Sequence, residues 1–402
     1  MILPVENSTT YWNVNFLLNP QIAPARRLFA ICRCCVVNYP RKMAVKGSRR
    51  VKTRKLELFI CISCGIAVIG FIFFTTKPSV LAKALSELSV LPLLAAVLCM
   101  IFYWLGETLT VHVLLKEHFE DQKFGDSLCL TMGGLYFGAI TPFSSGCQPF
   151  QAYYLSKKGR DVGVAASVLL TKFIVYQSAL VALSTALLLM RWKFFRAAVP
   201  GFYKLVLVGY AINLAILFFL IFLGLFRGIS DNICRFIIKL GAKIRLVKKP
   251  EETLAKAENA LEMFHNTFRD MRKHVPALLL AFACSVMELC AFFSVSYCVY
   301  RAFGLSGADL ITVVAAQGFV LVIASFIPIP GAGVGAEESY YFLLRNFYPE
   351  EGQIKVAIII WRLISYYLTL LTGMFFAMHI RRVKDAAARP TEEDTEDENR
   401  VV

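Results

Sequence analysis

Charged residues are scarce in this chain of 402 residues. Asp, Glu, Lys and Arg make up 18% of it, whereas hydrophobic residues make up 57% and mean hydropathy is +0.59. A typical soluble domain is about one quarter charged. The scarcity excludes a soluble enzyme, a disordered protein and a disulfide scaffold. The long apolar runs predict an all-α polytopic membrane protein, and because these runs do not alternate, they argue against a β-barrel.

Metal-binding patterns are missing as well. The five histidines form no HExxH or comparable pair, and most of the 12 cysteines are scattered through apolar runs, where cysteine acts as a small hydrophobe. Cys32, Cys34 and Cys35 form a cluster, but no second Cys or His pair follows it at the spacing of a zinc site. We therefore expect neither a metal nor a cofactor.

Acidic residues are few compared with basic ones, 28 against 43, and the net charge is +15. The basic residues lie mainly between the apolar runs, which is the pattern of the positive-inside rule. We expect the lipid bilayer and phospholipid headgroups as partners, and no nucleic acid.

Six apolar runs are long enough to cross a membrane of about 30 Å. They are Leu58–Thr76, Ser89–Leu115, Val162–Leu189, Phe202–Phe226, Val275–Tyr300 and Val356–Met378. Leu128–Ile140 is too short and ends in a Pro/Gly tip over residues 141–146. Leu310–Ile327 ends in a second tip, and the short arm Ser339–Phe347 follows it. Each tip predicts a re-entrant hairpin, since irregular backbone at membrane depth must be covered by protein or line a cavity.

The order of these segments predicts two inverted repeats, each of three spans plus one re-entrant hairpin. The first repeat covers residues 56–190, and the second covers 202–226 and 275–380. A cytoplasmic amphipathic connector, 227–274, lies inside the second, and residues 381–402 form an acidic disordered tail. Lys172 and Tyr176 are echoed by Arg362 and Tyr366. Both termini are expected in the cytoplasm, and inverted repeats with broken helices are typical of transporters.

The tips indicate an anion site. The second arm of a hairpin begins deep in the bilayer, where free N–H groups and the positive helix end attract a phosphate. Lys172 and Arg362 would add positive charge, while Glu107, Glu288 and Glu337 would balance it or hold a cationic group. A charge at the centre of a span costs at least ~2.5–3.5 kcal/mol, so we expect each of these charged residues to have a partner or a function that offsets this cost.

Plainer interpretations stay open for these residues. Glu107 or Glu288 would then only bond a neighbouring helix, and Lys172 would extend to the interface. Glu338 would be a carboxylate at a helix start, and the glycines would serve close packing. The run from Gly331 to Gly335 is no dinucleotide loop, because no strand precedes it.

The two tips together resemble the lysylphosphatidylglycerol synthase transmembrane-region family, also called flippase-like. A first motif like T-P-x-x-x-G-G-Q/E-P-x-Q/R-x-Y-x-L stands here as Thr141 to Leu155, and a second like P-x-P-G-A-x-G-x-x-E runs from Pro328 to Glu337. The resemblance covers about residues 52–385, and its basic positions match Lys172 and Arg362. Cys147 stands where a glycine is common, and glutamines at 148 and 151 replace the Glu and Arg of other branches.

The motifs and charges together name the candidate substrate-binding residues. They are Thr141, Pro142, Ser144, Gly146, Gln148, Gln151, Lys172, Pro328, Pro330, Gly331, Gly333, Glu337, Glu338 and Arg362, with Glu107 and Glu288 as secondary candidates and no catalytic or metal-binding residue.

The resemblance implies a lipid translocase that handles a phosphate-bearing lipid, with lysylphosphatidylglycerol as one option. It also implies a bacterial inner membrane and a link to resistance against cationic peptides. Two alternatives remain: a phosphatidylglycerol lysyltransferase that uses lysyl-tRNA, and a non-transporting membrane subunit of a lipid enzyme. We expect no transferase chemistry, because the family's soluble synthase domain has no room after the last span. A separate synthase protein and a homodimer are open as further partners.

The segment before residue 56 generates the first testable prediction. Residues 1–55 read as an N-terminal extension and a basic cytoplasmic segment, and residues 41–55 hold eight basic and no acidic residues. Met43 opens this basic stretch, so we expect it to be the natural start. Mass spectrometry of N-terminal peptides from the native protein should find peptides that begin at or next to Met43. A peptide from residues 1–42 would contradict the prediction.

Overall fold

The computed structural model describes residues 83, 85–198, 202–243, 250–324 and 333–387. The chain divides into two units, Met1–Phe59 and Ile60–Val402, and every described residue belongs to the second. The predicted first span, the Met43 segment, the Cys32–Cys35 cluster, the second tip at 325–332 and the tail after residue 387 lie outside the described residues.

All longer elements in the described ranges are α-helices, so the predicted all-α class is confirmed. The helices are α4 (Val90–Lys116), α5 (Phe124–Ala139), α6 (Cys147–Lys157), α7 (Val162–Ala198), α8 (Phe202–Leu225), α9 (Arg227–Lys243), α10 (Pro250–Met271), α11 (Val275–Ala302), α12 (Leu310–Ala324), α13 (Gly333–Leu344), α14 (Glu351–Arg362) and α15 (Leu368–Ala387). Two 3-10 turns, η3 (Pro142–Ser144) and η5 (Arg345–Phe347), and a π-helical segment, η6 (Leu363–Tyr367), complete the set.

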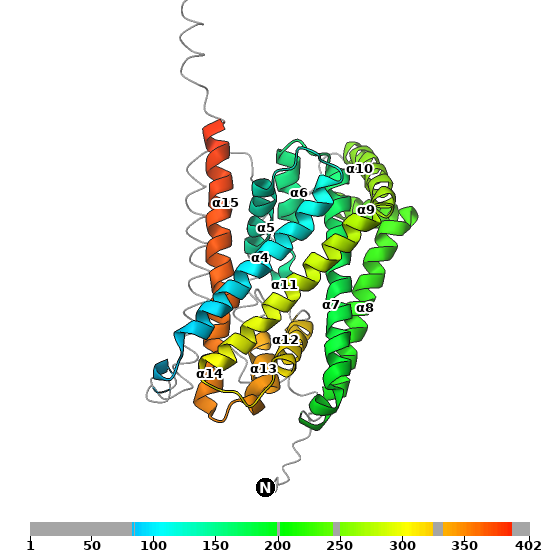
Figure 1. Ribbon diagram of the computed structural model, residues 1–402. Coiled ribbons are helices and arrows are strands. Elements are labelled where there is room, and N and C mark those ends of the chain that lie inside the picture. The colour runs from blue at the N-terminus through cyan, green and yellow to red at the C-terminus, as the bar shows by residue number, and fades with distance from the viewer. Residues whose placement is uncertain (1–82, 84, 199–201, 244–249, 325–332, 388–402) are drawn as a thin grey trace, which may run out of the picture. The chain divides into compact units, whose positions relative to one another are not determined.

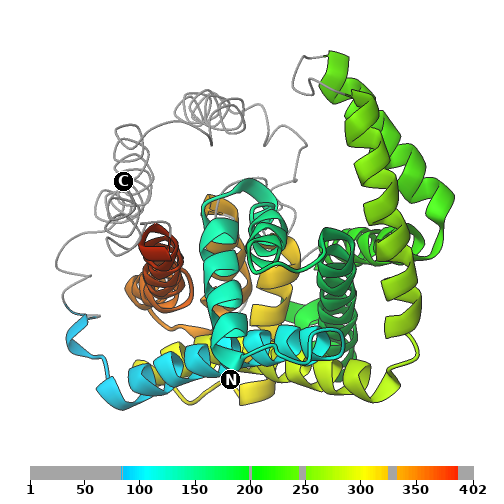
Figure 2. The ribbon, with the colours of Figure 1, turned by 90° about the horizontal axis from the view of Figure 1, so that it is seen from above.

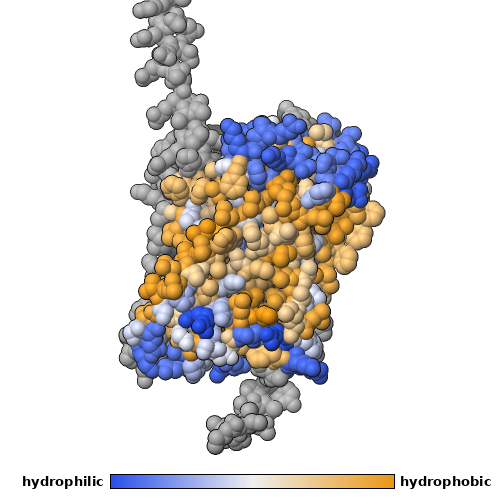
Figure 3. Space-filling model, in the orientation of Figure 1, coloured by the Kyte–Doolittle hydropathy of each residue, from blue (hydrophilic) through white to orange (hydrophobic). Residues whose placement is uncertain are grey.

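Five segments of the described chain are long and apolar enough to cross a membrane. They are Val90–Lys116, Val162–Arg196, Val208–Leu225, Val275–Ala302 and Glu351–Met378. Figure 3 shows the band of hydrophobic residues that they form between two hydrophilic ends. These helices make the chain a multi-pass membrane protein.

The two predicted short arms are helices that do not reach across the membrane. At 1.5 Å per residue, the 16 residues of α5 and the 15 of α12 extend about 24 and 22 Å, less than the roughly 30 Å of the hydrocarbon core. Figure 1 shows α5 and α6 towards the end of the bundle that carries α10, and α12 and α13 towards the opposite end. The two pairs of short helices therefore approach from opposite ends.

Helices α4 and α11 lie against each other along their length, as Figures 1 and 2 show. The outer face of α4 carries exposed apolar residues at helical spacing, Leu91, Leu94, Leu98 and Phe102, which suits contact with lipid tails. On the inner face, a Cβ added to Gly106 would lie 2.7 Å from Cβ of Glu288. The missing side chain at Gly106 is what lets the two backbones approach.

The short helices pack across the molecule. Helix α5 lies against α15, and α12 lies against α7 and α8. A Cβ added to Gly373 of α15 would lie 2.6 Å from the carbonyl oxygen of Met132 in α5. Each short pair thus rests on a spanning helix from the other half of the chain.

Three segments differ in detail from their sequence prediction. Helix α7 continues past the predicted Leu189 to Ala198, with a kink at Arg191, whose guanidinium pairs with Asp309. The connector holds two helices, α9 and α10, of which α10 packs on α7 and α8. The last span is an α-helix interrupted by the π-helical turn η6 directly after Arg362.

The α4–α11 contact generates the second prediction. Gly→Ala in a helix normally stabilises by about 0.5–1 kcal/mol. At Gly106 the new Cβ meets Cβ of Glu288 and the Cys284 carbonyl oxygen, at 2.7 and 3.2 Å, so G106A should lower stability by roughly 1–3 kcal/mol through overpacking. Thermal unfolding of the detergent-purified protein measures this change. G125A is the matched control, because nothing lies within 4 Å of its added Cβ. Equal melting temperatures for the two variants would contradict the close approach.

Candidate functional site

The first tip is held by the side chain of Thr141. Its hydroxyl donates to the carbonyl oxygen of Phe137 at 2.7 Å and accepts from the N–H of Gly146 at 2.8 Å. The chain then turns sharply through η3, which begins at Pro142, and Phe143 and Ser144 both have φ of +53°. A Cβ on Gly146 would lie 2.7 Å from the carbonyl oxygen of Phe137, so only glycine fits. The hydrogen bonds of Thr141 and the close packing at Gly146 therefore fix the conformation of the tip.

The two arms of the first hairpin touch along a glycine face of α5. A Cβ on Gly134 would lie 2.8 Å from Nε2 of Gln151, and one on Gly133 would collide with the ring of Phe150. Gln151 is 1% exposed, and its Nε2 has no hydrogen-bond partner among the described residues. Gln148, one turn nearer the tip, is half-buried. Gln151 is therefore a buried amide whose Nε2 no described residue satisfies.

Lys172 of α7 meets two carboxyl groups in the middle of the bundle. Its ammonium forms an ion pair with Glu107 of α4, and Glu288 of α11 acts on both groups electrostatically. The exposed fractions are 9% for Lys172, 5% for Glu107 and 0% for Glu288. The sequence named all three residues, and the structure brings them together. Buried charges survive only when paired, so Glu107 neutralises Lys172 in this state.

Tyr103 and Tyr176 complete this cluster, and the sequence analysis did not name them as site residues. Tyr103 interacts electrostatically with Glu107, Glu288, Tyr176 and Cys147. The available signal was spacing: Tyr103 stands four residues before Glu107, and Tyr176 four after Lys172, so each pair shares a helix face. Cys147, the first residue of α6, also interacts with Lys172. Lys172 therefore lies near the start of the hairpin's second arm.

Arg362 of α14 is the second buried cation. Its Nε lies 3.2 Å from Oε1 of Glu337 in the second turn of α13. The guanidinium lies 4.9 Å from the ring of Trp361 and 5.7 Å from that of Tyr366. Arg362 is 6% exposed. The arginine therefore sits between a carboxylate and two aromatic faces, which stabilise a cation.

Tyr366 connects this arginine to the first hairpin. Its hydroxyl donates to the carbonyl oxygen of Ala139, the last residue of α5, at 3.0 Å. Tyr366 belongs to the π-helical turn η6, and such turns occur frequently at functional sites. The extra residue of the π turn changes the direction of the side chains that follow Arg362.

The remaining predicted residues divide into two groups. Pro328, Pro330 and Gly331 lie outside the described residues, so their part in an anion site stays a prediction. Gly333 opens α13, and Glu338 is exposed. Glu338 is thus more exposed than its neighbour Glu337, which pairs with Arg362.

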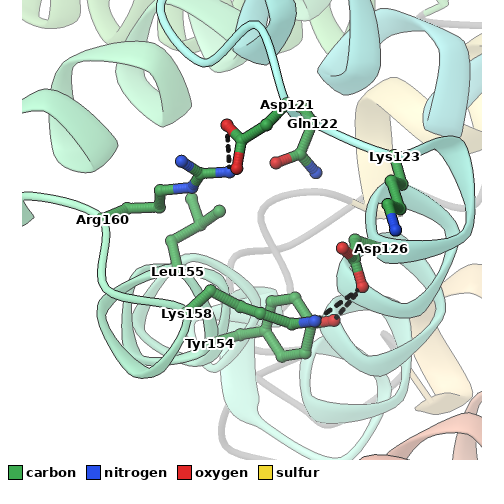
Figure 4. Close-up of a pocket in the computed structure, with 8 residues that line it drawn as sticks. All are labelled: Asp121, Gln122, Lys123, Asp126, Tyr154, Leu155, Lys158 and Arg160. Carbon is green, nitrogen blue, oxygen red and sulfur yellow. Dashed lines mark hydrogen bonds and ion pairs between the residues drawn. The ribbon is translucent and has the colours of Figure 1, made fainter.

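A polar pocket of about 190 Å³ lies where the first hairpin leaves the bundle. Figure 4 shows Arg160 pointing to Asp121, and Lys158 and Tyr154 converging on Asp126. The corresponding distances are 2.7 Å for Arg160 Nη2–Asp121 Oδ1 and 2.9 Å for Lys158 Nζ–Asp126 Oδ1. The hydrogen bond from Arg160 holds the pKa of the Asp121 carboxyl below its usual range. The sequence analysis missed this pocket, because its residues come from two separate segments, 121–126 and 154–160.

Comparison with known families decides what kind of chain this is. Residues 60–373 match the family described as the lysylphosphatidylglycerol synthase TM region. The chain belongs to that family. The match takes in both hairpins, and it includes Glu107, Lys172, Glu288, Glu337 and Arg362. The buried charges and the first hairpin therefore lie within the matched region.

A curated relative of the family comes from Archaeoglobus fulgidus. It is called a UPF0104 membrane protein and is 27% identical over 329 residues, which cover 78% of this chain and 94% of the relative. The chain is similar to this relative over nearly the relative's whole length. The name of this relative states a membrane location and no activity.

The Thr141 contacts generate the third prediction. T141V keeps the shape of the side chain but loses both hydrogen bonds, worth about 1 kcal/mol each. Amide exchange of Gly146 should become roughly 5-fold faster when the bond to its N–H is lost. Hydrogen exchange followed by mass spectrometry of peptides over residues 141–150 measures the change. T141S restores the hydroxyl and is the control; equal exchange in T141V and T141S would show that the hydroxyl does not hold the tip.

Proposed function

We propose that this protein moves a phosphate-bearing lipid between the two leaflets of a membrane. One observation carries the proposal: each buried cation lies beside the start of a hairpin's second arm. Lys172 interacts with Cys147, the first residue of α6, and Arg362 contacts Glu337 in the second turn of α13. A helix start supplies free N–H groups and positive potential, and a neighbouring cation strengthens the attraction for an anion. The two places suit a phosphate headgroup.

The arrangement of the helices supports alternating access. The contacts of the two halves correspond. In the first half α4 packs on α5 and α6 packs on α7, and in the second half α11 packs on α12 and α13 packs on α14. The hairpins approach from opposite ends of the bundle (Figure 1). We therefore infer two inverted repeats that rock about a common site, as in many secondary transporters. By the positive-inside rule, the end that carries α10 faces the cytoplasm, together with both termini, in a bacterial inner membrane.

The family description suggests the substrate class. An aminoacylated phosphatidylglycerol, such as its lysyl ester, carries a phosphate and an amine, and the site offers cations and carboxylates close together. In this proposal a separate synthase protein makes the lipid, and this chain exposes it on the outer leaflet. A cationic headgroup there would repel cationic peptides, since surface charge controls their binding. A homodimer remains a prediction.

The buried cations generate the fourth prediction. K172Q and R362Q should each lower lipid translocation by roughly 10- to 100-fold, because a charge-assisted hydrogen bond to phosphate contributes about 1.5–3 kcal/mol. Translocation is measured in proteoliposomes that contain a fluorescent anionic phospholipid. A membrane-impermeant reagent quenches the labelled lipid in the outer leaflet, so the fluorescence that remains reports the lipid in the inner leaflet. K355Q is the matched control on α14, because Lys355 pairs only with Glu351 on its own helix among the described residues.

Two further measurements separate folding and enzymology from transport. Removing Lys172 leaves Glu107 unpaired, so E107Q/K172Q, which removes both charges, should fold like the wild type and still fail to transport. Wild-type transport in K172Q and R362Q would remove these residues from the mechanism. A total-lipid mass spectrum of a host that lacks aminoacyl lipids should stay unchanged when it expresses this chain. New lysylphosphatidylglycerol would show the lysyltransferase alternative instead.

A further inference from the structure

The charges at the α4–α7–α11 crossing do not balance. Glu107 and Glu288 contribute two carboxyl groups, and Lys172 contributes one ammonium. All three are at least nine-tenths buried inside helices that span the membrane. With every group ionised, one negative charge would remain without compensation. An unpaired buried charge is strongly unfavourable, so this state needs another ligand.

The geometry of Glu288 identifies that ligand. If Glu288 is ionised, neither of its carboxylate oxygens accepts a hydrogen bond from a described residue. The side chain best placed to bond with Glu288 is Glu107, which follows Gly106 on α4, where the backbones of α4 and α11 approach most closely. Two carboxylates have only acceptors and cannot bond to each other, whereas a carboxylic acid donates one O–H. A hydrogen bond between Glu107 and Glu288 would therefore require one proton.

The surroundings favour a proton over a metal ion. The titratable groups facing Glu288 are Tyr103 and Glu107 on α4, Lys172 and Tyr176 on α7, and Cys284 on its own helix. Within the described ranges, no group of three or more His, Cys, Asp or Glu could hold a metal. Glu107 is already engaged by Lys172. A hydrogen ion needs only two acceptors, and Glu107 and Glu288 provide them.

We propose that Glu107, Glu288 and Lys172 form a proton-binding site, and that the site takes up one proton with each headgroup whose phosphate binds Lys172 and that brings no amine to Glu107, such as the anionic probe lipid. This coupling rests on the lipid translocation proposed above. Without lipid, ionised Glu107 pairs with Lys172 while Glu288 holds one proton, and the site is neutral. A phosphate that draws the ammonium away leaves Glu107 uncompensated, so Glu107 gains a proton from water. The bound site is again neutral, and the proton returns to water on the other side with the departing lipid.

The proton site itself is tested without transport. Infrared spectra of the purified protein in lipid nanodiscs at pH 7 should contain the carbonyl band of a buried carboxylic acid. E288Q should lose this band, because the remaining Glu107 stays ionised beside Lys172. E120Q, which changes an exposed carboxyl at the hydrophilic end, should keep it. A band of equal size in E288Q and the wild type would overturn the proposal.

The coupling is tested in the proteoliposome assay with an imposed pH gradient. If one proton moves with each probe lipid of single negative charge, the ratio of probe between the two leaflets should change about tenfold per pH unit of the gradient. Because the proton cancels the charge of the probe, the ratio should not respond to the membrane potential. E288Q should lose the pH response. Wild-type translocation that ignores the pH gradient, or follows a sodium gradient instead, would overturn the coupling and leave the translocase standing. If the wild type moves no lipid under any gradient, translocation and coupling both fall, and the infrared spectra alone decide the proton site.

Discussion

The pairing of Lys172 with Glu107 is the contact on which the centre of this protein depends. A lone charge inside a membrane span is costly, and a paired one is tolerated. The ion pair joins α7 to α4, and Glu288 brings in α11. Gly106 stands beside Glu107 and lets the backbone of α11 come close enough for the three charges to meet. Packing and electrostatics therefore constrain each other at one crossing.

The second cation is stabilised differently. Arg362 lies between the carboxylate of Glu337 and the rings of Trp361 and Tyr366, and a π-helical turn begins at the next residue. Through the hydroxyl of Tyr366, this turn also contacts the end of α5. The hydroxyl of Tyr366 thus links the segment that carries Arg362 to the first hairpin. The two charged sites are joined by packed helices, as the rocking motion proposed above requires.

Much of the fold could be predicted from local sequence. Apolar run length predicted the spanning helices, and the Pro/Gly tip at 141–146 predicted the first hairpin. The continuation of α7 to Ala198 was missed, because Arg191 looked like the end of a span, and its partner Asp309 is distant in the sequence. The π-helical turn after Arg362 was also missed, since no residue type in Leu363–Tyr367 marks it.

The sequence by itself determined the class of the protein and its unusual residues, because hydrophobic length and the cost of a buried charge are properties of single segments. The sequence identified five charged residues in apolar segments whose cost must be offset: Glu107, Lys172, Glu288, Glu337 and Arg362. Only the tertiary structure decided which of them are partners. Glu107 and Lys172 are 65 positions apart, and Glu107 and Glu288 come from different halves of the chain. Their contact depends on how closely whole helices pack, which no local pattern encodes.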